Sequence, residues 1–301
     1  MIFRLLLLIT FIVTPIVQGI EFKANDRVIL LGNTFIERDV NFGHIETALS
    51  IGLADKKITF RNLGWSGDTV HGHARSYFGP PKEGFDRLSK HIDFIKPSVV
   101  IICYGAVAAF EGEQGVSDFE KGYSKLIDMI RSKAESRIVL MSPPPCENLG
   151  PPLPNMDSQN IRLSRYNQVI KNLSFKKECD YIDLFSALGA GKIRMIPPIT
   201  LNGVHFTSQG YKKISSKIIN ILGLRELNHI SNSEREKLRQ IILQKNRLFF
   251  NRWRPQNETY LHGFRKHEQG NNAKEIFMFD PLIKDKENQI HSLAISISKE
   301  K

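Results

Sequence analysis

Short apolar runs alternate with longer amphipathic segments between about residues 27 and 222. The runs are apolar almost without interruption, as strands buried on both faces of a sheet require. They predict strands at 27–31, 58–62, 99–104, 138–142 and 181–184. Apolar residues at helical spacing predict helices at about 42–54, 82–96, 117–135, 158–177 and 208–222. The alternation predicts a three-layer α/β fold, in which helices cover both faces of a five-stranded parallel sheet.

The pattern changes after Leu224, where the alternation of strands and helices stops. Ser233 and Glu236 fit a capping box, and apolar residues at helical spacing follow it as far as Phe249. This pattern predicts one amphipathic helix, followed by an irregular aromatic and basic stretch and, from Asp280, a further polar helix.

We therefore expect a main domain at 20–226 and a basic, aromatic helical extension at 227–301. A segment of fewer than ~80 residues rarely sustains a core of its own, so we expect the extension to pack on the main domain. Its aromatic residues are then the contacts that hold it there: Phe249, Phe250, Trp253 and Tyr260.

The first 19 residues predict a cleavable secretory signal peptide. Arg4 precedes an apolar run that continues to Val13, and Pro15 and Gly19 follow it. The alternative is an uncleaved membrane anchor, but the run is shorter than the ~20 apolar residues that a spanning helix needs. We expect a secreted or periplasmic protein without an integral membrane segment after cleavage.

Charge and cysteine content narrow the range of partners. A formal net charge of +11 suits a polyanionic partner or, alternatively, reflects scattered solvated side chains. The basic residues do not form a nucleic-acid-binding motif, so we expect no nucleic-acid partner. Cys103, Cys146 and Cys179 are too few for a disulfide framework, and their odd number leaves at least one thiol free or paired outside the chain.

The residues that carry chemistry follow the predicted strands, and parallel sheets form their sites at the carboxyl ends of the strands. Residues 32–34 (Gly-Asn-Thr) follow the first strand, and 62–69 (Asn-Leu-Gly-Trp-Ser-Gly-Asp-Thr) follow the second. Residues 103–109 follow the third strand, and 202–207 (Asn-Gly-Val-His-Phe-Thr) precede the last helix of the main domain. Taken singly, each block also fits ordinary turn or helix-capping chemistry.

In this order and at these spacings, the four blocks resemble the SGNH/GDSL hydrolase superfamily over about residues 26–222. The segment RNLGWSGDT carries the most specific match, and NGVHFTSQGY resembles the block that contains the catalytic histidine of the family. The segments GNTFIER and NRLFFNRWRPQNETY look like a subgroup of secreted proteins from planctomycetes and related bacteria. The resemblance implies a flavodoxin-like arrangement and hydrolysis of esters, without a cofactor or a metal.

The resemblance places the family's nucleophile at Thr34 and its catalytic histidine at His205. It places the oxyanion-binding amides at Thr34 and Gly67. Three positions depart from the family pattern. At the first, Thr34 stands in place of the family's serine, and its secondary hydroxyl is more crowded. Val107 stands where the family has an oxyanion-binding asparagine, and the loss of one such donor lowers rates ~10²–10³-fold. Asn202 stands in place of the acid that orients the histidine, an exchange that lowers the rate of a serine protease about 10⁴-fold.

Other polar residues near the blocks are candidates to compensate for these departures, or else are surface and capping groups. Asn33 and Asp68 are possible supporting residues, and the other candidates are Glu37, Arg38, His71 and His73. His71 and His73 lack a third ligand at a clear spacing, so the sequence assigns no metal.

Two functions remain open from the sequence. The first is an exported esterase or deacetylase that acts on acylated carbohydrate or a small-molecule ester, with Thr34 as nucleophile, His205 as proton relay and Asn202 as its orienting partner. The second is a catalytically weak or inactive relative that binds a glycan or a partner protein through the same cleft. The sequence leaves the oligomeric state open.

Overall fold

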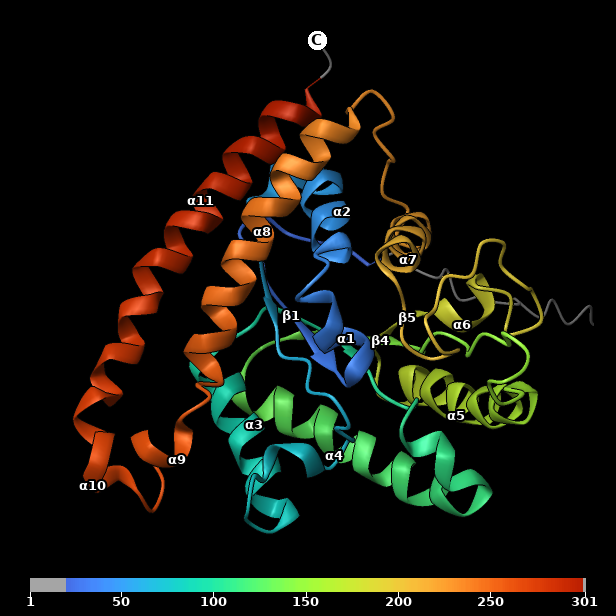
Figure 1. Cartoon of the computed structure of the whole chain (residues 1–301), viewed down its shortest axis with the longest axis horizontal. Coiled ribbons are helices and arrows are strands. Elements are labelled where there is room, and N and C mark those ends of the chain that lie inside the picture. Colours follow the sequence, from blue (N-terminus) through green and yellow to red (C-terminus); the bar gives the residue numbers. More distant parts are fainter. Residues whose placement is uncertain (1–19, 300–301) are drawn as a thin grey trace, which may run out of the picture.

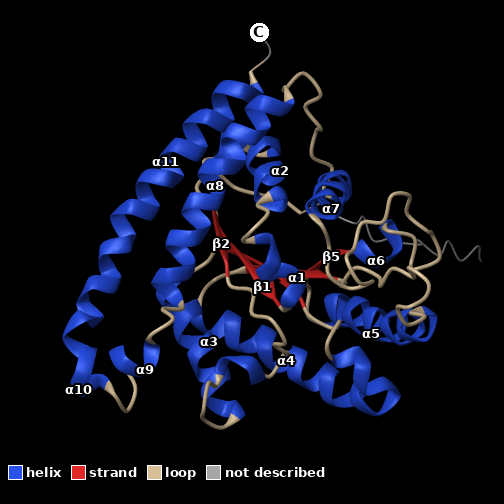
Figure 2. Cartoon of the chain, in the orientation of Figure 1, coloured by secondary structure: helices blue, strands red, loops and turns tan. Residues whose placement is uncertain are grey.

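A computed structural model describes residues 20–299, so the expected signal peptide at 1–19 lies outside the described residues. All five predicted strands are present and pair in parallel in the order β2-β1-β3-β4-β5. The strands, drawn in red in the centre of Figure 2, are β1 (Arg27–Gly32), β2 (Thr59–Asn62), β3 (Val99–Cys103), β4 (Arg137–Met141) and β5 (Asp180–Ile182). The prediction of a three-layer α/β fold is therefore confirmed.

The helices divide between the two faces of this sheet (Figure 1). One face is covered by α3 (Pro81–Ile95), α4 (Val116–Lys133) and α5 (Asp157–Lys176). The other is covered by α1 (Thr34–Asp39), α2 (His44–Gly52), α6 (Leu184–Ala187) and α7 (Ser208–Ile221). Short 3₁₀ helices occupy Ala54–Lys56, His73–Arg75 and Ala108–Gly115 in the connecting segments.

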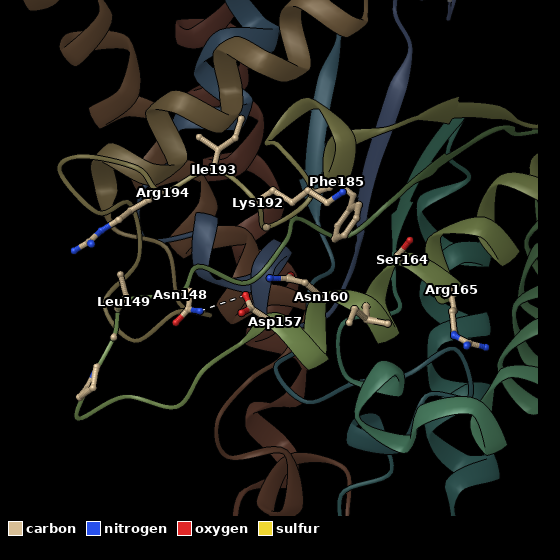
Figure 3. Close-up of a pocket in the computed structure, with 15 residues that line it drawn as sticks. Asn148, Leu149, Asp157, Asn160, Ser164, Arg165, Phe185, Lys192, Ile193 and Arg194 are labelled. Atoms are coloured by element: carbon tan, nitrogen blue, oxygen red, sulfur yellow. Dashed lines mark hydrogen bonds between the residues drawn. The ribbon is translucent and has the colours of Figure 1, made fainter.

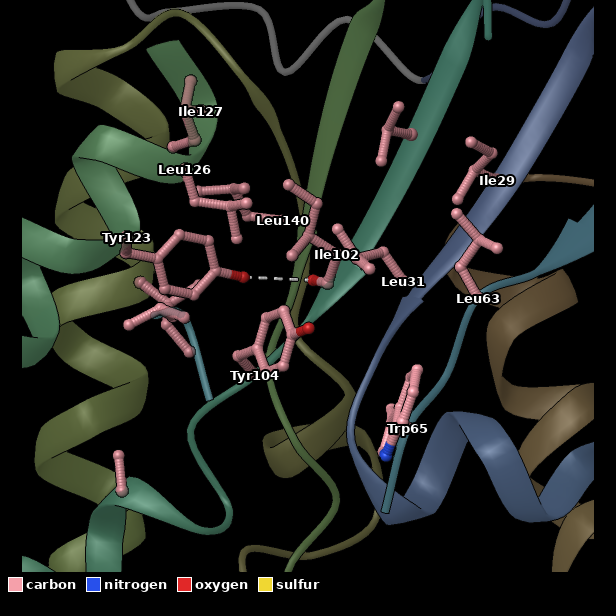
Figure 4. Close-up of a cluster of buried hydrophobic side chains, with 14 of the residues drawn as sticks. Ile29, Leu31, Leu63, Trp65, Ile102, Tyr104, Tyr123, Leu126, Ile127 and Leu140 are labelled. Carbon is pink, nitrogen blue, oxygen red and sulfur yellow. Dashed lines mark hydrogen bonds between the residues drawn. The ribbon is translucent and has the colours of Figure 1, made fainter. Parts of the chain in front are cut away.

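The uninterrupted apolar runs of the strands supply both faces of the sheet with core residues. In β1, Ile29 and Leu31 pack toward α3–α5, whereas Val28 and Leu30 pack on the opposite side. Side chains of successive strand residues point to opposite faces, so only a continuous apolar run can fill both layers. Figure 4 shows the first of these two clusters, where the Tyr123 hydroxyl donates a hydrogen bond to a carbonyl oxygen of β3.

The C-terminal extension packs on the main domain, as expected. It consists of α8 (Asn232–Trp253), α9 (Glu258–Leu261), α10 (Lys266–Gln269), the 3₁₀ helix Gly270–Met278 and α11 (Phe279–Ser298). In Figure 1, α8 and α11 lie side by side against α2. Their apolar residues form a third cluster with Ile51 and Ala54 at the end of α2.

Three details of the extension differ from the predictions. The capping box is formed by Ser231 and Glu234, two residues before the predicted pair of Ser233 and Glu236. Helix α8 continues through Trp253 into the stretch predicted to be irregular. Helix α11 is amphipathic rather than polar, because one of its faces is buried against α8 and α2.

A buried ion pair joins the extension to the main domain. The Lys245 ammonium donates 2.7 Å and 2.9 Å hydrogen bonds to the Glu46 carboxylate and the Phe60 carbonyl. Lys245 is fully buried, and Phe60 belongs to β2, the edge strand that α8 covers. The aromatic contacts expected in the extension are present too, since Phe249 and Trp253 are both buried.

Neither disulfides nor membrane spans occur in the described part of the chain. Within 20–299, all three cysteines are free, with Cys103 and Cys146 buried. None of the helices in that range combines the length and the apolar character needed to cross a bilayer.

Candidate active site

The turn after β1 presents Thr34 at the first position of α1. Asn33 caps this helix, since its side-chain oxygen accepts a 3.4 Å hydrogen bond from the Phe35 amide. The Thr34 hydroxyl is half-buried and accepts a 3.3 Å hydrogen bond from the Gly67 amide. The turn thus places a hydroxyl beside a backbone donor at the carboxyl edge of the sheet, where α/β proteins build their sites.

The segment after β2 is fixed to α1 by a buried asparagine. Asn62 donates a 2.7 Å hydrogen bond to the Ile36 carbonyl and accepts one of 2.8 Å from the Gly64 amide. A Cβ atom at Gly64 would lie 2.2 Å from the Glu37 nitrogen, so only glycine permits this close approach. These contacts hold Gly67, which has a φ of +75°, with its amide directed at Thr34.

The loop that carries His205 is held by a buried carboxylate. Glu147, which follows β4, accepts hydrogen bonds from the amide and the hydroxyl of Thr200 at 2.9 and 2.6 Å. The Glu147 amide in turn donates a 2.8 Å hydrogen bond to the Gly203 carbonyl. Sequence reasoning missed this positioning residue, because its partners lie more than 50 residues away and no local pattern marks it.

Asn202 fixes the tautomer of His205. The side-chain oxygen of Asn202 accepts hydrogen bonds from the Val204 and His205 amides at 3.2 and 2.9 Å, which settles the orientation of its amide group. Its Nδ2 lies 3.3 Å from His205 Nδ1. An amide nitrogen only donates, so Nδ1 accepts and Nε2 carries the proton of the neutral ring. A histidine that takes a proton at Nε2 needs the opposite tautomer.

Thr34 and His205 line one small cavity of about 80 Å³. Asn33 and Arg38 also line it, and Val107 lies in its wall, so the expected side-chain donor is replaced by an apolar surface. Among the described residues, the Thr34 hydroxyl is bonded to Gly67 and the His205 ring to Asn202, and no hydrogen bond joins Thr34 to His205. Burial, and then the positive charge of Arg38, lower the pKa of His205 below its usual range.

The remaining candidate residues lie outside this cavity. Asp68 is fully buried in an ion pair with Arg75 and accepts a hydrogen bond from Tyr104. His71 and His73 bond to Asp118 and Thr69, respectively. Glu37 accepts hydrogen bonds from the Ser66 amide and from Arg254 of the extension. Within 20–299, no cluster of three or more metal-ligating side chains is found.

A much larger cleft, of about 1120 Å³, opens beside the small cavity (Figure 3). The two spaces share the loop after β4 and helix α5, since Pro144–Cys146 and Leu163 line the cavity and 148–151 and Asn160 line the cleft. Asn160, which lines the cleft, exchanges hydrogen bonds with the backbone of Cys146, which lines the cavity, so the two spaces adjoin at this pair. Lys192 and Arg194 add positive charge to the opposite wall of the cleft.

Comparison with known proteins identifies the family of the chain. The sequence profile of the GDSL-like Lipase/Acylhydrolase family matches residues 41–213. No curated protein sequence matches the chain.

Similar folds occur among solved structures of low sequence identity. One is a catalytic mutant of an acetylxylan esterase from Geobacillus stearothermophilus, with a TM-score of 0.53, 14% identity and coverage of 68% of this chain and 98% of that one. An α/β hydrolase enzyme from the metagenome of Lake Arreo has a TM-score of 0.52 at 14% identity, over 67% of this chain and 97% of its own. A gut microbial diltiazem-metabolizing enzyme has a TM-score of 0.54 at 14% identity, over 69% of this chain and 49% of its own.

Proposed function

Because the chain belongs to the GDSL-like Lipase/Acylhydrolase family, we propose that it hydrolyses ester bonds, with acylated carbohydrate as its substrate. The observation that carries the proposal is the small cavity, which is lined by both Thr34 and His205. The Gly67 amide donates a hydrogen bond to the Thr34 hydroxyl at this cavity. A cavity of about 80 Å³ suits a short acyl group, since one water molecule fills ~30 Å³ of liquid. The neighbouring cleft has room for the sugar that carries it.

In this mechanism, Thr34 Oγ1 attacks the carbonyl carbon and passes its proton to His205. The amides of Gly67 and Thr34 stabilise the negative charge that develops on the carbonyl oxygen. The ester C–O bond then breaks, and His205 returns the proton to the leaving alcohol oxygen. Water, deprotonated by His205, then attacks the acyl carbon; the bond from this carbon to Thr34 Oγ1 breaks, the acid leaves, and His205 returns the proton to Thr34 Oγ1.

The site supports a slow reaction. Val107 offers no donor to the oxyanion, and the Asn202 amide favours the tautomer of His205 that cannot accept a proton at Nε2. Arg38 opposes the positive charge that His205 acquires during the reaction. All three features act on the transition state, so they lower kcat more than substrate binding.

The Asn202–His205 pair favours a second candidate function, which is binding without turnover. A ring held with its proton on Nε2 is a hydrogen-bond donor to a ligand in the cavity. In this alternative, the family cleft binds a glycan or a partner protein and releases it unchanged.

We also propose that the protein is exported from the cytoplasm. The apolar run and small residues at 1–19 support export as a secreted or periplasmic protein. Release of a fusion reporter into the periplasm or medium, and its retention when 1–19 are deleted, would test this part.

The activity test compares hydrolysis of 4-nitrophenyl acetate and acetylated xylooligosaccharides by the native protein and four variants. Thr34→Ala and His205→Ala should each abolish turnover, whereas Thr34→Ser should retain or raise it. His267→Ala serves as the matched control, because this histidine is exposed in the extension. Turnover that survives both alanine substitutions would exclude the mechanism.

A double variant separates the two candidate functions. Val107→Asn with Asn202→Asp restores the oxyanion donor and the acidic partner, so we expect at least a ~100-fold increase in kcat. If the double variant folds and still does not turn over either substrate, the binding function is favoured.

A further inference from the structure

An arginine in the small cavity has no partner within the described chain. Arg38 is four residues after Thr34 on α1, which brings both side chains to the same face of the helix. The side chain is half-buried, and its Nε is buried without a hydrogen-bond partner. Most of the surrounding wall is apolar, with Phe35, Val107, Phe206 and neighbouring residues. A buried guanidinium nitrogen without an acceptor is costly unless a ligand provides one.

A second unpartnered donor lines the same cavity. Asn33 is only 2% exposed, and its Oδ1 is engaged with the Phe35 amide. Its Nδ2 is buried and has no partner. Because the capping contact assigns the oxygen, the free group is a hydrogen-bond donor.

The His205 ring lines the same cavity, and its Nδ1 faces the Asn202 amide nitrogen. The cavity lining contains no Asp or Glu among the described residues. The two acids nearest in sequence to Arg38 are engaged elsewhere, since Glu37 pairs with Arg254 and Asp39 accepts from the His44 amide. The cavity therefore combines one cation and one free neutral donor, and its lining supplies no negative charge to pair with the cation.

We propose that this cavity binds a carboxylate group, held by Arg38 and Asn33, so that the substrate is an anionic ester. This inference rests on the proposed function and specifies its substrate class. The carboxylate belongs either to the acyl part, as in a half-ester of a dicarboxylic acid, or to the sugar, as in an acetylated uronic acid. In both cases it lies a few bonds from the reacting carbonyl, because Arg38 and Thr34 line the same 80 Å³ space.

A bound carboxylate also offsets the electrostatic part of the weakness of the site. It neutralises Arg38, whose charge otherwise lowers the pKa of His205. It places a negative charge near the ring, where Asn202 supplies none. The substrate then contributes the electrostatic stabilisation of the imidazolium that an aspartate gives in related hydrolases.

Binding is tested without turnover, with acetate and acetamide as probes of nearly equal shape. Ring signals of His205 in histidine-labelled protein are followed by NMR during titration at constant ionic strength. We expect acetate to bind about tenfold more tightly than acetamide, since a charge-assisted contact replaces a neutral one. Arg38→Gln should abolish the preference, and Arg38→Lys should retain part of it.

Matched variants identify the donors. Asn33→Asp keeps the helix cap but replaces the free donor with an acceptor, so acetate binding should fall about tenfold or more. Arg162→Gln removes the same charge as Arg38→Gln from an exposed position and should leave the preference unchanged. Equal binding of acetate and acetamide by the native protein, or a preference that survives Arg38→Gln, would overturn the inference.

Hydrolysis then distinguishes the sources of the carboxylate. One pair is 4-nitrophenyl hydrogen succinate and its neutral methyl ester, and the other is acetylated methyl glucuronoside and acetylated methyl glucoside. We expect faster hydrolysis of the charged member in one of the two pairs. The pair that shows this preference identifies whether the carboxylate belongs to the acyl part or to the sugar. Equal turnover of the charged and neutral members within both pairs would contradict the carboxylate site and leave the hydrolase function supported. Acetate binding without turnover of any of these esters contradicts the hydrolase function and leaves the carboxylate site intact.

Discussion

Two arginines, Arg75 and Arg38, lie at the same end of the sheet and differ in whether a carboxylate of the chain pairs with the guanidinium. Arg75 is completely buried, and its guanidinium donates to the Asp68 carboxylate at 2.6 Å and to the Leu63 carbonyl at 2.8 Å. Tyr104 completes the group by donating a 2.6 Å hydrogen bond to the same carboxylate. Figure 4 shows Tyr104 beside the apolar cluster against which this ion pair lies.

Arg38 has none of these partners, although one of its nitrogens is buried too. The contrast separates two uses of a buried cation. A buried cation that stabilises the fold pairs with a counter-charge in the same chain, whereas one that binds a ligand pairs with a counter-charge on that ligand. Substitutions at the two sites should therefore affect different properties.

The largest effect is expected at the internal pair. Asp68→Ala leaves Arg75 buried without its carboxylate, which should lower the free energy of unfolding by about 3–5 kcal/mol. Urea denaturation followed by circular dichroism measures this. Asp68→Leu combined with Arg75→Met removes both charges and should be more stable than Asp68→Ala. The opposite order would show that the pair contributes little, and the comparison with Arg38 would lose its basis.

Asp39, the residue after Arg38, should give a pH-dependent effect. Burial, and then repulsion from Glu46, raise its pKa from the ordinary value of 3.8 to about 7. Between these two pH values, the Asp39 carboxyl is protonated in the folded protein and ionised in the unfolded chain. Stability from this group is present below that ordinary value and is lost as the pH rises through about 7.

The variant Asp39→Asn should remove this dependence. It should match the native protein near pH ~4 and exceed its stability near pH ~8 by at least about 2 kcal/mol, as one pKa unit corresponds to about 1.4 kcal/mol. Urea denaturation at several pH values measures the difference. A constant difference across this range would mean that Asp39 is ionised throughout.

Arg254 lies between the two extremes, with a partner in the chain and partial exposure. Its guanidinium lies 3.6 Å from the centre of the Trp65 ring and pairs with Glu37 at 2.9 Å. Arg254→Ala should lower stability by about 1–2 kcal/mol. Arg265→Ala, which removes an exposed pair with Glu268, should have no measurable effect on thermal unfolding. Equal effects of the two variants would show that Arg254 does not hold the extension in place.

The smallest change in stability is expected for Arg38→Gln, within about 0.5 kcal/mol, because no partner in the chain is lost. The same variant should raise the pKa of His205 part of the way toward its ordinary value, since burial and then the charge of Arg38 lower it. An NMR titration of the ring measures this shift. A large loss of stability would place Arg38 in the same class as Arg75.

The sheet was predictable because each strand is a short, continuous apolar run, and in a protein of this composition such a run predicts a buried strand. The capping box was misplaced because SNSERE contains two overlapping matches. Burial of Ile230 with Leu238 fixes the earlier start, and this tertiary contact is invisible in the local pattern. Lys245 fits a helical repeat in the sequence, but nothing local identifies Glu46 as its partner.

The position of the site was predictable to a similar degree. Thr34, Gly67, Asn202 and His205 came from a pattern of blocks, and the structure brings all four together at one edge of the sheet. Asp68 and Arg38 looked alike from the sequence, as charged residues shortly after a strand. What distinguishes them is whether a counter-charge lies within reach, and that depends on residues distant in the sequence.

Glu37 has a consequence for how this protein changes over generations. It is on the same helix as Thr34, yet its carboxylate bonds to the extension through Arg254 and to the second block through the Ser66 amide. A lineage that shortened the chain after the main domain would leave the Glu37 carboxylate bonded to the Ser66 amide but without its counter-charge, three residues from Thr34. Loss of the extension and substitution at Glu37 are thus expected to occur together.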